Sequence, residues 1–369
     1  MTENQKHGLE LSIDSSSQRP LKIGKTTDQV FHGDEEEAET MNPKPGIQRY
    51  LVAVEYIGTR FSGSQQQPNC RTVVGALEEA FQKFIGQPVS VFCSSRTASD
   101  SCCDFSLFFL GTVKDAGVHA LSNVCHVDVE RISKRKPGEV LPPHEPGVVH
   151  KAVNHFLQKH EGDVTVVDVR SVPNDFHARY KAQERTYFYR LVSGPEALSS
   201  FEKDRAWHVP ETLNIGAMQE ACKVLVGHHD FSSFRAAGCQ ANSPIRTLDE
   251  LNVCEVASTP YFPTSMERKQ RQGKEESENE EPHSETCEVG FGIRRRHRCF
   301  VVTARARSFL YHQVRLMVGV LKAVGTGDLT VGDVERILEA KNVSSARPMA
   351  PACGLYLGHV KYDLPPAPH

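Results

Sequence analysis

The sequence has no long hydrophobic run and no unusual abundance of glycine or proline. Its longest apolar stretches, such as residues 105–110 and 316–321, fall well short of the roughly 18 residues that a membrane-spanning helix needs. Ordinary glycine, proline and charge contents exclude collagen-like, coiled-coil and wholly disordered chains. We therefore expect a folded protein with no membrane partner. Its 369 residues allow one large domain or two ordinary ones.

Standard cofactor and metal motifs are also missing. The sequence holds eleven cysteines, an odd number, and no C-x-x-C pair. This pattern argues against a zinc ribbon and a secreted disulfide framework, so we expect reduced thiols in an intracellular compartment. There is likewise no G-x-G-x-x-G, P-loop, H-E-x-x-H or G-x-S-x-G segment. The common nucleotide-binding, zinc-protease and serine-hydrolase chemistries are therefore not indicated.

The net charge of −3 is the sum of unevenly placed charges. Residues 1–47 and residues 258–288 are polar, lack apolar periodicity and each carry a net charge of −4. We expect both to be solvated segments, which leaves +5 on the rest of the chain. A basic folded body is compatible with an RNA partner, and the alternative is an ordinary solvated strand edge. The clustered arginines are Arg294, Arg295, Arg296, Arg298, Arg305, Arg307 and Arg315.

Apolar periodicity predicts a mixed α+β fold in two similar halves, each with an element order close to β-α-β-β-α-β. This order favours mainly antiparallel sheets with helices packed on one face, and a cleft where the halves join. We expect a disordered extension at 1–47, halves at 48–180 and 181–363, and a tail at 364–369. The predicted strands are 49–56, 88–93, 119–129, 163–169, 184–192, 245–256, 298–306 and 354–362. The predicted helices are 73–85, 148–158, 215–226, 309–324 and 331–341.

Asp115 is a candidate catalytic carboxylate, because it lies in a glycine-containing turn just before a predicted strand. The alternative is an ordinary turn residue. Arg96 and Arg315 are its candidate partners, since arginines keep a carboxylate ionised, as a nucleophile requires. Tyr187 and Tyr189 lie on one face of a predicted strand. One of them is suited to the core and the other to stacking on an extruded base, and the sequence does not say which.

Two further groups suggest chemistry less strongly. His228 and His229 could bind a metal, but adjacent histidines point in different directions, so a loop and cap role with Phe231 and Phe234 buried is favoured. Cys102 and Cys103 could form a redox pair, but vicinal disulfides are strained and structural thiols are the simpler interpretation.

Six segments, in order and at suitable spacing between residues 49 and 363, together resemble one family. They are SSRT (94–97), DAGVHALSN (115–123), DFHARYKAQERTYFYRL (175–191), GHHDFSSFR (227–235), SFLYHQVRLMVG (308–319) and GLYL (354–357). The chain resembles the TruA family of tRNA pseudouridine synthases, and its likeness is greatest to the animal members of that family. The family's catalytic signature is R-T followed by D-A-G-V-H-A.

The resemblance implies an isomerase that converts uridine to pseudouridine in tRNA or other structured RNA, without metal or cofactor. It implies two ferredoxin-like halves around a central cleft. Asp115 matches the family nucleophile, which attacks the ribose C1′ or the uracil C6. Tyr187 matches the tyrosine that contacts the flipped uridine, and Arg96 and Arg315 match the substrate-binding arginines. A homodimer and a mitochondrial location are also implied by the family, with a cytoplasmic location as the alternative.

The chain departs from the family within the signature itself. Seventeen residues, 98–114, separate Thr97 from Asp115, and removing them restores SSRTDAGVHALSN. We interpret this segment as a retained intron or a splice variant, and a genuine insertion is the alternative. Because Arg96 and Asp115 no longer share one turn, a catalytically impaired RNA-binding protein of the same fold stays open as an alternative. A metal-dependent hydrolase using His228 and His229 is a third hypothesis.

Overall fold

The computed structural model describes residues 46–95, 117–257 and 297–364, except residues 68, 134, 137, 160, 161 and 347. All described residues belong to one unit, Pro43–His369. Several predicted segments lie outside the described residues: the N-terminal extension up to residue 45, the insertion 98–114, the acidic segment 258–288 and the tail from residue 365.

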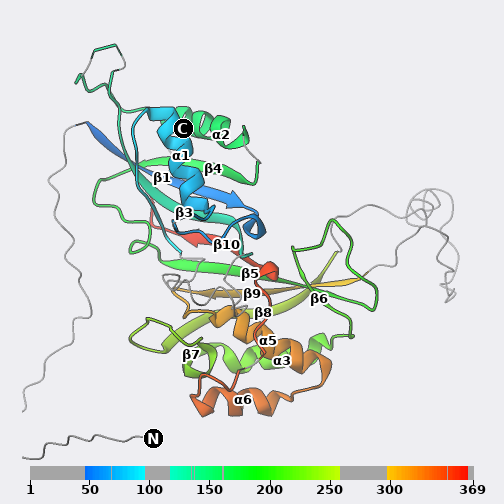
Figure 1. The fold of residues 1–369 in the computed structure, drawn as a ribbon. Helices are drawn as coiled ribbons and strands as arrows, with labels where there is room; N and C mark the ends of the chain where they lie inside the picture. The colour runs from blue at the N-terminus through cyan, green and yellow to red at the C-terminus, as the bar shows by residue number, and fades with distance from the viewer. Residues whose placement is uncertain are drawn as a thin grey trace, which may run out of the picture. The chain divides into compact units, whose positions relative to one another are not determined.

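One ten-stranded sheet runs through this unit (Figure 1). Its strand order is β4-β1-β3-β10-β5-β9-β8-β7, with β2 paired to β3 and β6 paired to β5. The pairs are antiparallel except for β10 with β3 and β5 with β6. The strands are β1 (Ile47–Tyr56), β2 (Val91–Cys93), β3 (His119–Glu130), β4 (Val164–Val172), β5 (Glu184–Ser193), β6 (Trp207–Val209), β7 (Gly227–Asp230), β8 (Ile245–Val256), β9 (Arg298–Ala306) and β10 (Leu355–Lys361).

Two groups of helices cover the two parts of the sheet. In Figure 1, α1 and α2 lie beside β1 and β4, whereas α3 and α5 lie beside β8 and β9, and α6 packs against α3. Side chains cap the helix starts where the sequence allows, since Thr72, Asn214 and Thr330 each accept a backbone N–H. The helices are α1 (Val73–Ile85), α2 (Pro146–Gln158), α3 (Ile215–Leu225), α5 (Gln313–Thr326) and α6 (Val331–Ala340). No helix in the described ranges is both long enough and apolar enough to span a membrane.

The two parts of the sheet repeat one strand order. In the first part the order is β4-β1-β3-β2, and in the second, leaving aside the short β6 and β7, it is β10-β5-β9-β8. Each is the fourth, first, third and second strand of its own part. Each part has its own hydrophobic core, one built around Tyr50 and Phe81 and the other around Phe300 and Met317. The mixed α+β architecture is therefore confirmed.

The predicted elements match the observed ones closely, with three informative differences. The three-residue strand β6 was not predicted. The segment Gly227–Asp230, predicted as a loop, is strand β7, although Phe231 and Phe234 are fully buried as predicted. The helix predicted from residue 309 begins only at Gln313. His312 adopts a left-handed conformation with φ 61°, and the Gln313 side chain accepts the Leu310 N–H, so a turn precedes the helix.

Gly58 is required by a close backbone approach. It lies in a single 3₁₀ turn, Gly58–Arg60, and a Cβ there would stand 1.8 Å from the Val118 carbonyl oxygen. We predict that Gly58→Ala lowers the free energy of unfolding by about 1–3 kcal/mol, because the backbone leading into β3 must move. Gly147→Ala is the matched control, since a Cβ there meets no atom within 4 Å. Urea denaturation measures the free energy of unfolding of both variants. An unchanged free energy in Gly58→Ala would contradict this packing.

Candidate functional site

Two of the four predicted site residues lie in the described part of the chain. Tyr187 is on β5 and Arg315 is on α5. Arg96 and Asp115 both belong to residues 96–116, which lie outside the described residues. The residues that flank this segment are described, and they show how its two ends are held.

The end that leads into the segment is held by Arg185 on β5. Its Nε donates to the Ser95 hydroxyl at 3.1 Å. One terminal nitrogen donates to the carbonyl oxygens of Ser94 at 2.9 Å and Arg179 at 3.2 Å, and the other donates to that of Arg307 at 2.7 Å. Both serines are buried. One guanidinium therefore fixes the chain immediately before the segment to three other parts of the fold.

The other end of the segment enters β3 through a tightly packed turn. Val118 is buried in the core of the second part, and its carbonyl lies against Gly58. His119 accepts the Gly58 N–H through Nδ1 at 3.1 Å, and its Nε2 lies 3.1 Å from the Asp204 carbonyl oxygen. The Nε2 therefore carries the proton and donates it to that oxygen. Gly117, the first described residue here, is buried with φ 110°.

Tyr187 and Tyr189 differ in their surroundings, and the structure shows which of the two is the core residue. Tyr189 is fully buried and donates its hydroxyl to the Pro351 carbonyl at 2.7 Å, so it is the core residue. Tyr187 is half-buried, packs edge-on against Phe309 at 5.2 Å and hydrogen-bonds with the Ser95 side chain. Burial raises the pKa of Tyr187, against smaller opposing effects of Arg185 and Ser95, so its phenol is neutral at neutral pH.

Arg315 is buried on α5 and is tied to the segment Ala350–Cys353. Its Nε donates to the Ala350 carbonyl at 2.8 Å, and the Ala350 N–H donates back to the Arg315 carbonyl at 3.1 Å. Burial raises the pKa of the Cys353 thiol, and the positive charge of Arg315 opposes that rise. A Cβ at Gly117 would lie 3.6 Å from Ala352 and 3.8 Å from the Cys353 nitrogen. Residues 350–353 therefore join Arg315 to the entrance of β3.

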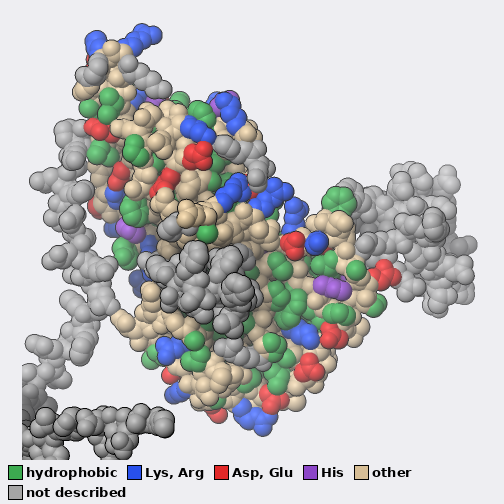
Figure 2. All heavy atoms as spheres, viewed as in Figure 1, with side chains coloured by type: hydrophobic (Ala, Val, Ile, Leu, Met, Phe, Trp, Pro, Cys, Tyr) green, Lys and Arg blue, Asp and Glu red, His purple; other side chains and the backbone are tan. Residues whose placement is uncertain are grey.

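Two of the clustered arginines form ion pairs with glutamates on neighbouring strands. Arg298 pairs with Glu255 at 2.7 Å, and Arg305 pairs with Glu184 at 2.8 Å and with Glu250 at 3.0 Å. These cross-strand ion pairs involve two of the clustered arginines that made the folded body compatible with an RNA partner. On the face shown in Figure 2, basic and acidic side chains are interspersed, with a group of Lys and Arg near the middle of the view. Arg294, Arg295 and Arg296 lie outside the described residues.

His228 and His229 have separate local partners. The Nδ1 of His228 lies 2.9 Å from the Thr247 hydroxyl, and the Nε2 of His229 lies 3.0 Å from the Val226 carbonyl oxygen. Successive residues of a strand point to opposite faces, so β7 directs the two imidazoles apart. Within the described ranges, no group of three or more His, Cys, Asp or Glu side chains is arranged to hold a metal ion. All eight cysteines in those ranges are free thiols.

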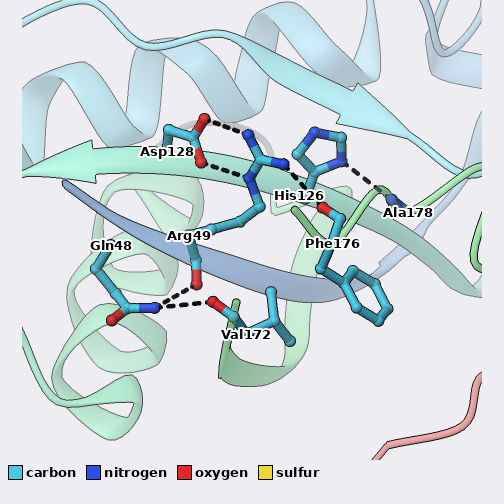
Figure 3. A network of polar contacts seen from close by, with 7 residues as sticks. All are labelled: Gln48, Arg49, His126, Asp128, Val172, Phe176 and Ala178. Atoms are coloured by element: carbon cyan, nitrogen blue, oxygen red, sulfur yellow. Dashed lines mark hydrogen bonds and ion pairs between the residues drawn. The ribbon is translucent and has the colours of Figure 1, made fainter. Parts of the chain in front are cut away.

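Sequence reasoning missed Arg185 and a second arginine anchor, Arg49 on β1. Figure 3 shows Arg49 forming two hydrogen bonds of 2.6 Å with the Asp128 carboxylate and one of 2.9 Å with the Phe176 carbonyl oxygen. The signal for Arg185 was available, because strand alternation places it on the same face as Tyr187. Arg49 gave no such signal, since its partners lie 79 and 127 residues away.

Comparison with known proteins identifies the family. A family model described as tRNA pseudouridine synthase matches residues 221–363. Over 316 residues the chain is 39% identical to a tRNA pseudouridine synthase A of Rhodospirillum centenum, covering 86% of this chain and all of the relative. The chain belongs to the TruA family of tRNA pseudouridine synthases. Similar proteins of the same name from Xanthobacter autotrophicus and Paramagnetospirillum magneticum are each 37% identical, covering 85% of this chain and 99% and 95% of the relatives.

The regions matched by the comparisons include the described site residues of this TruA-family chain. The family model covers the part that holds α5, Arg315 and β10, and the alignments with whole relatives include most of the chain. These relatives are bacterial, so the greater likeness to animal members stays a prediction.

We predict that Arg185→Lys loosens the chain at Ser94 and Ser95, since an ammonium cannot reproduce the four contacts of the guanidinium. The free energy of unfolding should fall by about 1–3 kcal/mol. Amide hydrogen exchange at Ser94, whose N–H donates to Val124 at 2.7 Å, should become faster. Arg170→Lys, at a partly exposed site on β4, is the control and should change neither quantity. Unchanged exchange at Ser94 would show that Arg185 does not anchor this end.

His119 should make stability depend on pH. Burial lowers its pKa from 6.5 to about 4, against the opposing effect of its bond to Asp204, so the folded protein holds it neutral. The unfolded chain takes up the proton first as pH falls, so stability is lost between about pH 6.5 and 4. His119→Asn should reduce the loss of unfolding free energy between pH 7 and 5 by about 2 kcal/mol. The exposed His359→Asn is the control, and equal pH dependence in all three proteins would refute the prediction.

Proposed function

We propose that this chain isomerises uridine to pseudouridine in tRNA. The supporting observation is that the flanks of residues 96–116 are fixed beside Tyr187 and beside the segment that binds Arg315. The segment between them carries Arg96 and Asp115, the residues that match the family signature. The relatives that are similar along their whole length carry the name tRNA pseudouridine synthase A.

In the proposed reaction Asp115 is the nucleophile. Its carboxylate attacks either the ribose C1′, with cleavage of the C1′–N1 bond, or the uracil C6. On either route the C1′–N1 bond breaks, the freed base turns and C5 bonds to C1′. The carboxylate of Asp115 is released from the carbon that it attacked, the hydrogen of C5 leaves as a proton and N1 takes up a proton. Uridine and pseudouridine are isomers, so no oxidant, reductant or other group is consumed.

The described residues support distinct steps of this reaction. Tyr187, a neutral and half-buried phenol, offers a flat ring and a hydroxyl to a uridine extruded from the RNA. Arg315 supplies a buried positive charge, which favours the ionised form of a nearby carboxylate. Arg185 acts as a positioning residue by fixing Ser94 and Ser95, because reacting groups tolerate a misplacement of only about 1 Å.

Finer features of the architecture are part of the same proposal. The repeated fourth-first-third-second strand order supports two ferredoxin-like halves, 48–180 and 181–363, with a cleft between them. A homodimer and a mitochondrial location rest on the family resemblance alone and are proposed on that basis.

A second candidate function is favoured by one observation, the seventeen residues between Thr97 and Asp115. If they keep Arg96 and Asp115 apart, the chain would bind RNA without isomerising it. Comparing the full chain with a variant that lacks residues 98–114 separates the two functions, because loss of activity caused by the insertion should be reversed by its removal.

We predict that Asp115→Asn abolishes pseudouridine formation, lowering the rate by at least about 10⁴-fold, because an amide cannot act as the nucleophile. Asp100→Asn, within the inserted residues, is the control and should keep full activity. Nucleoside analysis of treated tRNA by mass spectrometry after chemical labelling of pseudouridine measures both. Pseudouridine formation by Asp115→Asn at the rate of an active unaltered chain would exclude the assignment.

A further inference from the structure

A row of four aromatic rings crosses the first part of the sheet. Phe92 and His126 are stacked, with ring centroids 5.1 Å apart and an interplanar angle of 16°. His126 meets His177 at 4.7 Å, and His177 meets Tyr180 at 4.3 Å. Two rings come from β2 and β3, and two come from the connection between β4 and β5.

The two ends of this row are open to solvent. Phe92 is 52% exposed and Tyr180 is 71% exposed, whereas His126 between them is buried. The neighbours Val91 and Val127 belong to the core under α1, so strand alternation directs Phe92 and His126 to the opposite face of the sheet. Aromatic rings this exposed contribute little to folding at their positions, and their outer surfaces are open to a binding partner.

Hydrogen bonds to the backbone on either side of His177 fix the position of the row. His126 accepts the Ala178 N–H through Nδ1 at 3.2 Å, and Arg49 binds the Phe176 carbonyl while its charge is matched by Asp128 (Figure 3). These contacts fix the chain on both sides of His177. A rigid aromatic surface loses little conformational entropy on binding.

The histidines present neutral rings at neutral pH. Burial, followed by the charges of Arg49 and His177, lowers the pKa of His126 to about 4, although Asp128 opposes the shift. Burial, Arg49 and Arg179 lower the pKa of His177. The row is therefore uncharged, while exposed Arg179 and Lys181 adjoin Tyr180 in the chain.

We propose that the two exposed rings at the ends of this row, Phe92 and Tyr180, are a stacking platform for unpaired bases of the RNA substrate, other than the uridine that reacts, with His126 and His177 supporting them from within the fold. Planar rings accept the flat face of any base, and neighbouring basic side chains suit its phosphates. The exposed area is narrow and lies next to charged groups, which does not fit an apolar protein partner. The proposal rests on the proposed function in one respect, that the substrate is RNA.

Hydrogen bonds of Arg185 connect the platform to the chain that leads into residues 96–116. Phe92 lies two residues before Ser94, and Tyr180 follows Arg179 directly. Arg185 binds the carbonyl oxygens of both Ser94 and Arg179. A base on the platform would therefore set the position of the RNA relative to residues 96–116 and would favour substrates with an unpaired nucleotide at the right distance.

The test compares Tyr180→Ala and Phe92→Ala with the conservative Tyr180→Phe and Phe92→Tyr, in the full chain and with unmodified tRNA transcripts. Each alanine variant should raise both the Kd for tRNA and the KM about tenfold, the size expected for one lost base stack, and leave kcat unchanged. The conservative variants should match the unaltered chain. Phe201→Ala, which removes another ring that is 66% exposed, is the control and should change nothing.

The outcomes separate this proposal from the proposed function. Unchanged Kd and KM in both alanine variants would overturn the platform while pseudouridine formation continued. A chain that forms no pseudouridine, but binds tRNA with an affinity that depends on Tyr180 and Phe92, would refute the isomerase and support the platform. Light scattering gives the oligomeric state, and variants that lose a dimer but keep the tRNA affinity would assign the rings to a second copy and overturn the platform.

Discussion

The parallel pairing of β3 with β10 is the constraint on which the site depends. Ala120 of β3 lies beside Leu357 of β10, which in turn lies beside Tyr187 of β5. This register brings the chain that follows Asp115 to within two strands of Tyr187, although the three residues come from distant parts of the sequence. Val118 packs into the core of one part and Ala120 into that of the other, so the entrance of β3 is fixed by both.

Two arginines, the half-buried Arg185 and the buried Arg315, complete this arrangement. Arg185 bonds to backbone or hydroxyl oxygens at four places, and Arg315 shares two hydrogen bonds with Ala350. A guanidinium removed from water and left without acceptors is costly, so these contacts fix the backbone that supplies them. The positive charges that bind the described flanks of residues 96–116 are therefore part of the framework of the fold, and they suit the negatively charged nucleophile that we propose.

Much of this fold was predictable from the sequence, because long periodic segments such as 73–85 and 245–256 are helix and strand at their predicted bounds. The short strands β6 and β7 were not, since three or four residues are too few to show alternation. The left-handed conformation of His312 makes α5 begin at Gln313, later than predicted. Apolar periodicity carries no information about such a local backbone conformation. The predicted Tyr187 and Arg315 border the described flanks, whereas Arg185 and Arg49 escaped prediction because their partners are set by tertiary packing.

The central claim is that this TruA-family chain makes a carbon–carbon bond to C5 of uridine. The most direct test uses tRNA that contains uridine with tritium at C5, incubated with the full chain under single-turnover conditions. The account predicts release of tritium into water in step with the pseudouridine formed, because C5 must lose its hydrogen when it bonds to C1′. Tight binding of the same tRNA with no tritium released would contradict the account and identify an RNA-binding protein.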